Sequence, residues 1–318
     1  MRRKLKKILL IILIVIIIPF LGLEIYFEVD NILHEKRIEQ MKINNEMNIQ
    51  IESSVEHKTL KVDDYEIHYF VSGKKNNDLI VFLHPAFSDH RVFDQQIDFF
   101  SKNYRVITID LIGHGLSKAK KSNDKIDASA KHIQKILDVE GFDKAHLVGV
   151  SMGSLIAQYF ALNYPEKTKS LTALGSYNIN KENKEVAKAQ RSVNLNLVIR
   201  AVFSMKSFRK KTSQQICNSE RGQALFYETT SHYERKSFMI MQGLQNVIRE
   251  RESLNPQYPT LILAGEFDID LYKKMAKEWH SEIENSKYSE IENAGHCANI
   301  DKPLEFNKIV KEFIEVSD

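Results

Sequence analysis

The chain has 318 residues, of which 43% are hydrophobic and 27% are charged, a composition that supports a sizeable buried core and excludes wholesale disorder. Its formal net charge is +3, but five basic residues lie within the first seven positions, so the remainder is close to neutral and gives no support to a nucleic-acid partner. Two cysteines, Cys217 and Cys297, form no Cys-x-x-Cys or metal-ligand spacing, so they indicate neither a metal site nor a compartment.

The N-terminus has the pattern of a membrane-targeting segment. A basic flank over residues 1–7 is followed by sixteen residues, Ile8 to Leu23, that contain no charged or strongly polar side chain. A bilayer-spanning helix needs about 20 apolar residues, and the Ile-Tyr-Phe stretch after Glu24 extends the segment toward that length. We therefore predict a transmembrane signal anchor over residues 8–27.

Two alternatives to an uncleaved anchor stay open, namely a cleaved signal peptide and a buried soluble helix. The signal peptide is disfavoured because no Ala-x-Ala-like cleavage site follows the apolar run, and large residues (Glu24, Tyr26 and Phe27) stand where small ones are needed. Positive charge on the N-terminal flank favours its retention in the cytoplasm. We expect a single-pass protein of the cell membrane, with a cytoplasmic N-terminus and the bulk of the chain on the outer face.

Residues 28–57 are polar and charged and contain no Pro or Gly, with scattered Ile and Met at spacings partly compatible with a helix. This composition predicts a juxtamembrane helical stalk, with a flexible spacer as the alternative.

From Lys58 onward, strand-like and helix-like segments alternate. We predict strands in a hairpin over 58–73 and then over 78–84, 104–110, 145–150, 170–175, 260–265 and 287–293, and helices over 94–103, 126–141, 154–165 and 302–316. Such alternation predicts an α/β fold with a mostly parallel sheet and helices on both faces.

The alternation is interrupted over residues 177–257, which contain no convincing buried strand. A structureless loop of that length is rare in a compact domain, so we predict a helical cap inserted between two strands of one sheet. The core domain then consists of residues 58–176 and 258–318.

A Gly-Val-Ser-Met-Gly sequence, with Ser151 at its centre, lies where a predicted strand passes into a predicted helix. A sharp strand-to-helix turn exposes the central side chain at the end of the sheet, beside the amides of the helix N-terminus. Ser151 is therefore a candidate nucleophile. A helix N-cap is the structural alternative for this serine.

A serine nucleophile needs a base, and the base needs a carboxylate to orient it. Among eleven histidines, His296 is selected because it lies in the loop between the last strand and the last helix. Asp268 directly follows the strand predicted over 260–265 and is the candidate acid, with Asp270 as runner-up and Glu266 less favoured. Four other histidines are candidates for lining the pocket: His84, His90, His114 and His232.

The segments LHPAFSDH, DLIGHGLS, GVSMG, GEFD and NAGH occur in this order in the chain. With them the sequence resembles the cap-bearing branch of the α/β-hydrolase superfamily, from about Lys58 to Val316. The resemblance implies a mostly parallel eight-stranded sheet with helices on both faces and a helical cap insertion. It also implies that Ser151 is the nucleophile, Asp268 the acid and His296 the base.

The resemblance further implies an oxyanion hole made by two backbone N–H groups, those of Met152 and Ala86. Pro85 stands where the family commonly has glycine, and proline has no N–H, but the expected donor is the next residue. The resemblance implies neither a metal nor an organic cofactor.

Together these features predict a membrane-anchored serine hydrolase that cleaves an ester-like or other acyl bond through an acyl-enzyme, on a small-molecule or lipid substrate. The serine disfavours relatives that need an attacking carboxylate, the haloalkane dehalogenases and epoxide hydrolases. Thioesterase, peptidase, carbon–carbon hydrolase and cofactor-free peroxidase chemistry remain alternatives, as does a non-catalytic receptor or scaffold. The sequence does not indicate an oligomeric state.

Overall fold

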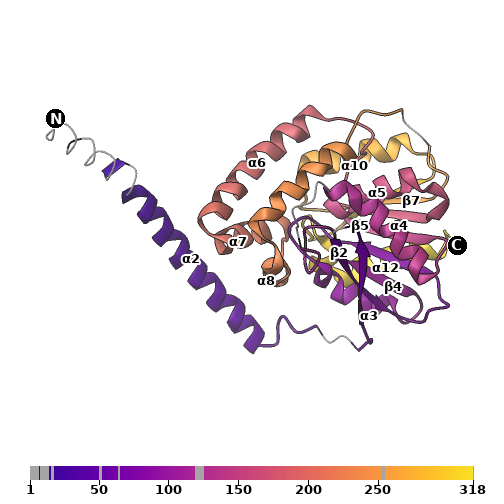
Figure 1. The fold of residues 1–318 in the computed structure, drawn as a ribbon, viewed down its shortest axis with the longest axis horizontal. Helices are drawn as coiled ribbons and strands as arrows, with labels where there is room; N and C mark the ends of the chain where they lie inside the picture. Colours follow the sequence, from indigo (N-terminus) through magenta and orange to yellow (C-terminus); the bar gives the residue numbers. More distant parts are fainter. Residues whose placement is uncertain are drawn as a thin grey trace.

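A computed structural model describes residues 18–49, 52–63, 65–118, 125–252 and 255–317, together with Lys7, Ile14 and Val15. Its centre is an eight-stranded sheet in the order β1-β2-β4-β3-β5-β6-β7-β8 (Figure 1). The strands are β1 (Glu56–Val62), β2 (Tyr65–Ser72), β3 (Leu79–Leu83), β4 (Arg105–Ile109), β5 (Ala145–Val150), β6 (Thr168–Leu174), β7 (Thr260–Gly265) and β8 (Ser286–Ile291). Strand β2 pairs antiparallel with β1 and β4, and all the other pairs are parallel. The eight-stranded, mostly parallel sheet predicted from the sequence is confirmed.

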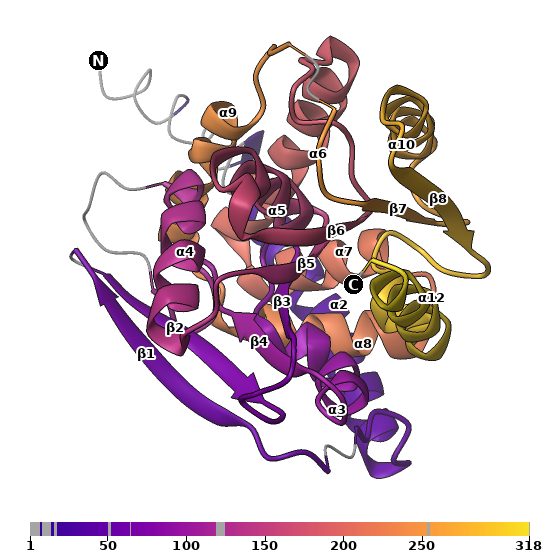
Figure 2. The same ribbon diagram turned by 90° about the vertical axis from the view of Figure 1, so that its right-hand side faces the viewer.

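Helices cover both faces of this sheet, so its central strands β3 and β5 are buried along their whole length. Helices α4 (Ser129–Glu140), α5 (Met152–Asn163) and α10 (Asp270–Glu282) pack on one face, and α3 (Asp94–Phe100) and α12 (Pro303–Glu315) on the other (Figure 2). A hydrophobic cluster lies on each face of the sheet, and alternate residues of β3 point into one cluster or the other. Both faces of this strand are therefore buried. The short elements η2 (His90–Phe93), η3 (Ile126–Ala128), η4 (Pro165–Lys167) and α11 (Ala298–Asp301) lie in the connections.

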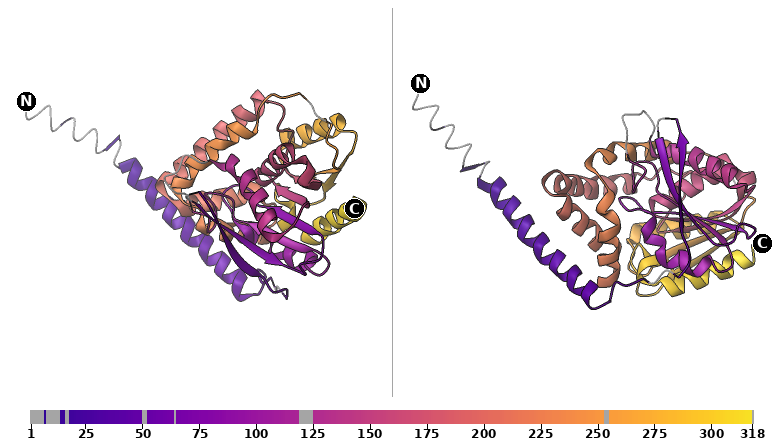
Figure 3. Two further views of the ribbon diagram at one scale, coloured as in Figure 1. Left: turned by 45° about the vertical axis from the view of Figure 1, so that its right-hand side comes forward. Right: turned by 60° about the horizontal axis from the view of Figure 1, so that its bottom comes forward.

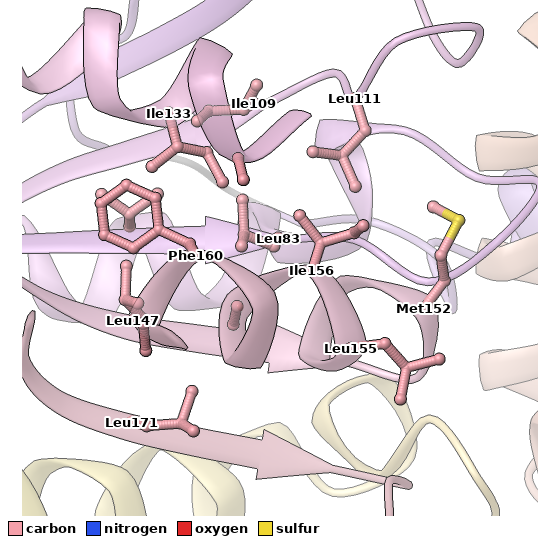
Figure 4. Packing of buried hydrophobic residues seen from close by; sticks show 14 of the residues in the cluster. Leu83, Ile109, Leu111, Ile133, Leu147, Met152, Leu155, Ile156, Phe160 and Leu171 are labelled. Carbon is pink, nitrogen blue, oxygen red and sulfur yellow. The ribbon is translucent and has the colours of Figure 1, made fainter. Parts of the chain in front are cut away.

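Helix α5 carries the largest share of the packing on its face of the sheet. Its inner side chains Ile156 and Phe160 are fully buried against Leu83 of β3, Leu147 of β5 and Ile133 of α4 (Figure 4). Burying a side chain of this size contributes about 1.5–3 kcal/mol. The helix is thereby held rigidly at the carboxyl end of β5, where it begins.

The segment between β6 and β7 forms a helical cap (Figure 1). They are α6 (Lys184–Phe203), α7 (Met205–Ile216), α8 (Glu220–Thr229), η5 (Thr230–His232), η6 (Arg235–Gly243) and α9 (Leu244–Val247). Over the described residues of this segment there is no strand. Side-chain caps begin two of these helices, because Ser204 accepts from the Ser207 N–H and Ser219 from the Gly222 N–H.

The N-terminal helix α2 (Ile18–Ile43) runs without a break through the boundary predicted near residue 27 and lies along the cap (Figure 3). Its side chains Phe27, Asn31, Ile38 and Met41 recur at helical spacing and are buried. The Asn31 Nδ2 donates to the Ser204 Oγ at 3.0 Å, at the start of α7. The predicted stalk is therefore helical up to Ile43, and it is docked on the protein rather than free.

Residues 8–13, 16 and 17 of the predicted transmembrane segment, and most of the basic flank, lie outside the described residues. Over the residues that are described, none of the helices combines the length and the apolar character needed to cross a bilayer.

One carboxylate joins the cap to the loop that precedes α11. The Asp301 Oδ2 accepts from the N–H groups of Asn218 (2.7 Å) and Gly295 (2.9 Å), and its Oδ1 accepts from the N–H (2.9 Å) and Oγ (2.6 Å) of Ser219. Asn218 and Ser219 belong to the cap, whereas Gly295 directly precedes His296. Asp301 therefore ties the position of this loop to the position of the cap.

We predict that Asp301→Ala lowers the free energy of unfolding by about 2–4 kcal/mol, because it leaves several backbone donors without an acceptor. Chemical denaturation measures the change. Asp270→Ala is the control, since the Asp270 side chain is fully exposed, and it should leave stability unchanged. Equal stability of the two variants would refute this role for Asp301.

Candidate active site

Ser151 occupies a strained turn between β5 and α5. Its φ is 52° and its ψ is −118°, a combination that residues with a side chain rarely adopt and that is concentrated at functional sites. The Ser151 N–H donates to the Leu174 carbonyl at the end of β6 (2.8 Å). Within the described structure its side chain makes no capping hydrogen bond to the first turn of α5, so the N-cap alternative does not account for this serine.

The two glycines of the motif are required because backbones approach closely on both sides of the turn. A Cβ at Gly153 would lie 1.9 Å from the Leu83 carbonyl oxygen, and a Cβ at Gly149 would lie 2.4 Å from the Ser154 Cα. Real Cβ atoms do not come this close to backbone. The glycines therefore let α5 begin directly against β3, and they leave Ser151 as the residue that must take the strained conformation.

His296 and Asp268 lie in loops that follow adjacent strands, β8 and β7, and their side chains meet. The His296 Nδ1 is 2.7 Å from the Asp268 Oδ1, which also accepts from the Ile269 N–H at 2.7 Å. Both side chains are buried. Burial lowers the pKa of His296, but the charge of Asp268 and its hydrogen bond outweigh burial and hold the pKa above the usual value of 6.5.

The backbone of β6 brings the histidine and the serine to the same edge of the sheet. Gly175 directly follows Leu174, whose carbonyl accepts from Ser151, and a Cβ at Gly175 would lie 2.7 Å from the His296 Cε1. The absent side chain of Gly175 thus leaves the space that the imidazole occupies. Glycine at this position, which sequence reasoning did not single out, is part of the site.

The two other acids considered from the sequence lie elsewhere. Asp270 begins α10 with a fully exposed side chain that pairs with Lys273 at 3.6 Å. The Glu266 Oε2 accepts from the Asn293 N–H at 2.8 Å. Of the three candidates, the structure brings Asp268 to His296.

The loop after β3 that contains Ala86 is held in place by its neighbours on both sides. The buried His84 donates from Nδ1 to the Pro85 carbonyl (2.8 Å) and accepts at Nε2 from the Leu111 N–H (3.0 Å). Burial lowers the pKa of His84, which keeps it neutral and able to make both bonds. Phe87 follows Ala86 with a φ of 70°, so this loop also contains a strained residue.

Phe87 projects from this loop into an aromatic cluster supplied by the cap. Its ring lies 5.2 Å from Phe208, 5.1 Å from Tyr233 and 5.9 Å from Phe238 between centroids, distances typical of favourable aromatic pairs. Phe208 and Phe238 pack within the cap, and through Phe87 they also touch the loop of Ala86.

A charged network joins the same loop to the cap. The fully buried Asp89 accepts from the Arg91 Nη2 (2.6 Å) and lies 3.0 Å from the His232 Nδ1 of η5. Arg91 also donates to the Glu228 carbonyl at 3.0 Å. Burial alone would raise the pKa of Asp89, but the hydrogen bonds from His232 and Arg91 hold it well below its usual range.

A cavity of about 460 Å³ lies where the end of α2, the cap helix α8 and the start of α3 meet. Its lining includes Lys42, Arg91, Asp94 and Glu228 but neither Ser151 nor His296. Across the described residues, no group of three His, Cys, Asp or Glu side chains is arranged to hold a metal ion.

Comparison with known families agrees with this geometry. The family model described as the alpha/beta hydrolase fold matches residues 78–303, a range that includes the Ser151 turn, the cap and the loops of Asp268 and His296. The chain therefore belongs to the α/β-hydrolase fold family, and the resemblance drawn from its sequence is confirmed.

Characterised relatives of the chain are hydrolases with several substrates. A monoacylglycerol lipase from Bos taurus is 23% identical over 79% of this chain and 80% of its own length. A 3-oxoadipate enol-lactonase from Acinetobacter baylyi is 25% identical over 77% of this chain and 91% of its own length. A solved structure of a membrane phospholipase A, titled a novel bacterial virulence factor, covers 100% of this chain and 99% of its own, with a TM-score of 0.70 and 19% identity.

We predict that Gly153→Ala lowers the free energy of unfolding by about 3 kcal/mol or more, because neither the Leu83 carbonyl nor the start of α5 can move away from the new methyl group. Thermal or chemical denaturation measures the change. Gly141→Ala is the control. Unlike Gly153, Gly141 has a positive φ of 80°, but nothing lies within 4 Å of the added Cβ, so the change should cost only about 1–2 kcal/mol. A cost for Gly153→Ala no greater than that of the control would contradict the overlap.

Proposed function

We propose that this protein is a membrane-anchored serine hydrolase that cleaves an acyl bond through a Ser151–His296–Asp268 triad. The observation that carries the proposal is the placement of the three residues. Ser151 lies in a strained turn bonded to Leu174, and the Asp268-bonded imidazole of His296 packs against Gly175, the next residue along β6. This placement supports activation of the serine hydroxyl, which is a poor nucleophile by itself.

The hydrogen bond to Asp268 determines which ring nitrogen of His296 acts as the base in the proposed reaction. Because the Nδ1–H donates a hydrogen bond to the carboxylate, Nε2 is the nitrogen that accepts the Ser151 proton while the Ser151 oxygen bonds to the acyl carbon. His296 then passes this proton to the leaving oxygen as the bond between the acyl carbon and that oxygen breaks. The acyl group is left as an ester on Ser151.

Hydrolysis of the acyl-enzyme repeats the sequence with water. His296 takes a proton from water as the water oxygen attacks the ester carbon, and it returns the proton to the Ser151 oxygen as the acid leaves. The negative charge on the acyl oxygen in both steps is stabilised by the N–H groups of Met152 and Ala86. Met152 is the first residue of α5, so its N–H has no partner within the helix, and removing one such donor typically costs about 3 kcal/mol of transition-state stabilisation.

The relatives support an acyl bond as the point of cleavage. The monoacylglycerol lipase and the enol-lactonase act, by their names, on esters and lactones. An epoxide hydrolase from Xenopus tropicalis is also similar, with 25% identity over 80% of this chain and 76% of its own length, but Ser151 does not supply the attacking carboxylate of that chemistry. An ester-like substrate, small or lipid, is therefore proposed ahead of the other reactions that share this triad.

Membrane attachment forms the second part of the proposal. It rests on the uncharged run from Ile8 to Leu23, on the basic flank before it, and on helix α2, which begins inside this run and continues to the cap. The similar membrane phospholipase A covers the whole chain, N-terminal helix included. We place residues 8–27 across the cell membrane with the hydrolase domain on the outer face, as the positive flank favours.

A fluorophosphonate probe tests the chemistry and the location together. We expect purified protein to be labelled and Ser151→Ala not to be, because the probe bonds only to an activated serine. On intact cells a membrane-impermeant probe should label the same protein in the membrane fraction.

Ser154→Ala is the matched control, since the Ser154 Oγ already donates to the Ser151 carbonyl, and it should retain labelling. Absence of labelling of the purified protein, or labelling that persists in Ser151→Ala, would refute the triad. Labelling of purified protein but not of intact cells would refute the outward orientation alone.

The pH dependence of kcat/KM tests the pairing of His296 with Asp268. His296 must be neutral to accept the serine proton, so activity should rise with pH, with a midpoint above 6.5 because Asp268 raises the pKa of His296. Asp268→Asn removes the charge that raises the pKa and leaves the burial that lowers it. The midpoint should then move to lower pH, and kcat should fall by about 10⁴-fold.

Asp270→Asn, at an exposed position two residues away, should change neither the midpoint nor kcat. If Asp270→Asn caused the loss and Asp268→Asn did not, the acid would have to be reassigned.

A further inference from the structure

The cap helix α6 presents an apolar stripe to solvent. Leu195, Val198, Ile199 and Val202 follow the i, i+3, i+4, i+7 spacing of one helix face, and they are 63%, 39%, 45% and 64% exposed. Spacing of this kind normally marks the face that a helix buries against its core. Here the same spacing faces outward.

Different residues form the side of α6 that faces the rest of the cap. Leu197 and Ala201 are buried, and they cluster with Phe208 and Tyr233, beside Phe87. These buried residues pack α6 against the rest of the cap, and the outer stripe is not part of that packing.

Helix α2 repeats this double-sided pattern and meets α6. One face is buried on the cap, as described above, while Leu21, Ile25, Val29 and Leu33 on its other faces are 49% to 65% exposed. The two helices touch where the Arg200 guanidinium of α6 lies 5.1 Å from the centre of the Phe27 ring. Figure 1 shows α6 on the side of the molecule toward which α2 extends.

We propose that the outer stripe of α6, together with Val29 and Leu33 of α2 just beyond the proposed membrane span, forms one surface that lies on the lipid bilayer. The occupant is indicated by continuity, because the exposed residues of α2 lead directly into the uncharged run that ends at Leu23. This inference rests on the membrane attachment in the proposed function.

The charge of the neighbouring helices fits an anionic lipid surface. Helices α6 and α7 carry four basic residues each, against a single acidic residue, Glu185. Asp30 and Glu35 of α2 pair with two of the lysines, Lys210 at 2.5 Å and Lys206 at 2.9 Å, which fastens the cap to the N-terminal helix. An amphipathic helix with basic neighbours binds the headgroup region through apolar burial and attraction to anionic lipids.

This surface lies close to the proposed catalytic machinery. The inner face of α6 contacts the cluster around Phe87, and Phe87 adjoins Ala86. Helix α6 and the aromatic cluster beneath it therefore separate the bilayer from the loop that contains the proposed oxyanion donor Ala86. The substrate class that this geometry favours is an acyl lipid drawn from the bilayer rather than an ester dissolved in water.

Depth-dependent fluorescence quenching tests contact with lipid. The full chain is reconstituted in vesicles of phosphatidylcholine and phosphatidylglycerol, with an NBD fluorophore on Val202→Cys or on the control Val139→Cys. Val139 lies on α4 and is also 64% exposed, and the native Cys217 and Cys297 are buried and so shielded from the label. We expect the label at residue 202 to shift to the blue and to be quenched by doxyl-labelled lipid, and the label at 139 to show neither effect.

The same measurement distinguishes a lipid surface from a second copy of the chain. If the label at 202 behaves like that at 139, the proposal is overturned. It is also overturned if the blue shift at 202 persists in detergent without lipid and grows with protein concentration, because a second copy then covers the stripe.

Hydrolysis rates test the consequence for the substrate. The double variant Leu195→Asp/Val202→Asp should lose about tenfold or more of its activity on vesicle lipids and keep its activity on a water-soluble short-chain ester. Val139→Asp/Leu304→Asp, at exposed positions of the core helices, should keep both activities, and equal losses in the two double variants would overturn the role of α6. If the wild type is not labelled by fluorophosphonate, the proposed function fails, and the quenching result still decides lipid contact.

Discussion

The close approach of α5 to the sheet is the constraint on which the site depends. Because Gly153 lies against the Leu83 carbonyl and Gly149 against Ser154, the chain can pass from β5 into the helix within one residue. That residue, Ser151, then has to adopt a positive φ, a strain offset by the rigid packing of Ile156 and Phe160 beneath it. The position of the serine is thus determined by backbone and core before any other side chain of the site contributes.

Two of the connections between the cap and the core run through the loops that flank this serine. Asp89, three residues after Ala86, accepts a hydrogen bond from Arg91 and lies within hydrogen-bond distance of His232. Asp301 holds the loop of His296 to the cap by accepting from the backbone of residues 218 and 219. The buried carboxylate of Asp89 needs several donors to be tolerated, and His232 of the cap lies within hydrogen-bond distance of it. The half-buried Asp301 accepts from Asn218 and Ser219 of the cap. Movement of the cap would therefore cost hydrogen bonds at the loop of the proposed oxyanion donor and at the loop of the proposed base.

The sequence was sufficient for those parts of the fold that local pattern determines. The strand and helix alternation, the turn at Ser151 and the loops of Asp268 and His296 each follow from a short segment and its position between elements. Gly175 and the pairing of Asp89 with His232 could not be found in this way, because they join segments that are distant in sequence and meet only in the folded sheet and cap. The sequence offered four histidines as candidates for lining the pocket, and two of them, His84 and His232, hold loops in place through their hydrogen bonds.

Helix α2 shows why a pattern can identify a helix without identifying its partner. When a helix has one apolar face, the sequence predicts which face is buried. Helix α2 has apolar residues on several faces, so its hydrophobic periodicity is weak and does not predict the buried face. The structure separates them into a face that packs on the cap, with Phe27 and Ile38, and others that remain exposed, with Ile25 and Val29. Since a stable helix of this kind needs a partner on each apolar face, the cap accounts for one, and the remaining surface needs an apolar environment of its own. The bilayer proposed at the N-terminal end of the same helix would meet that need with no further protein.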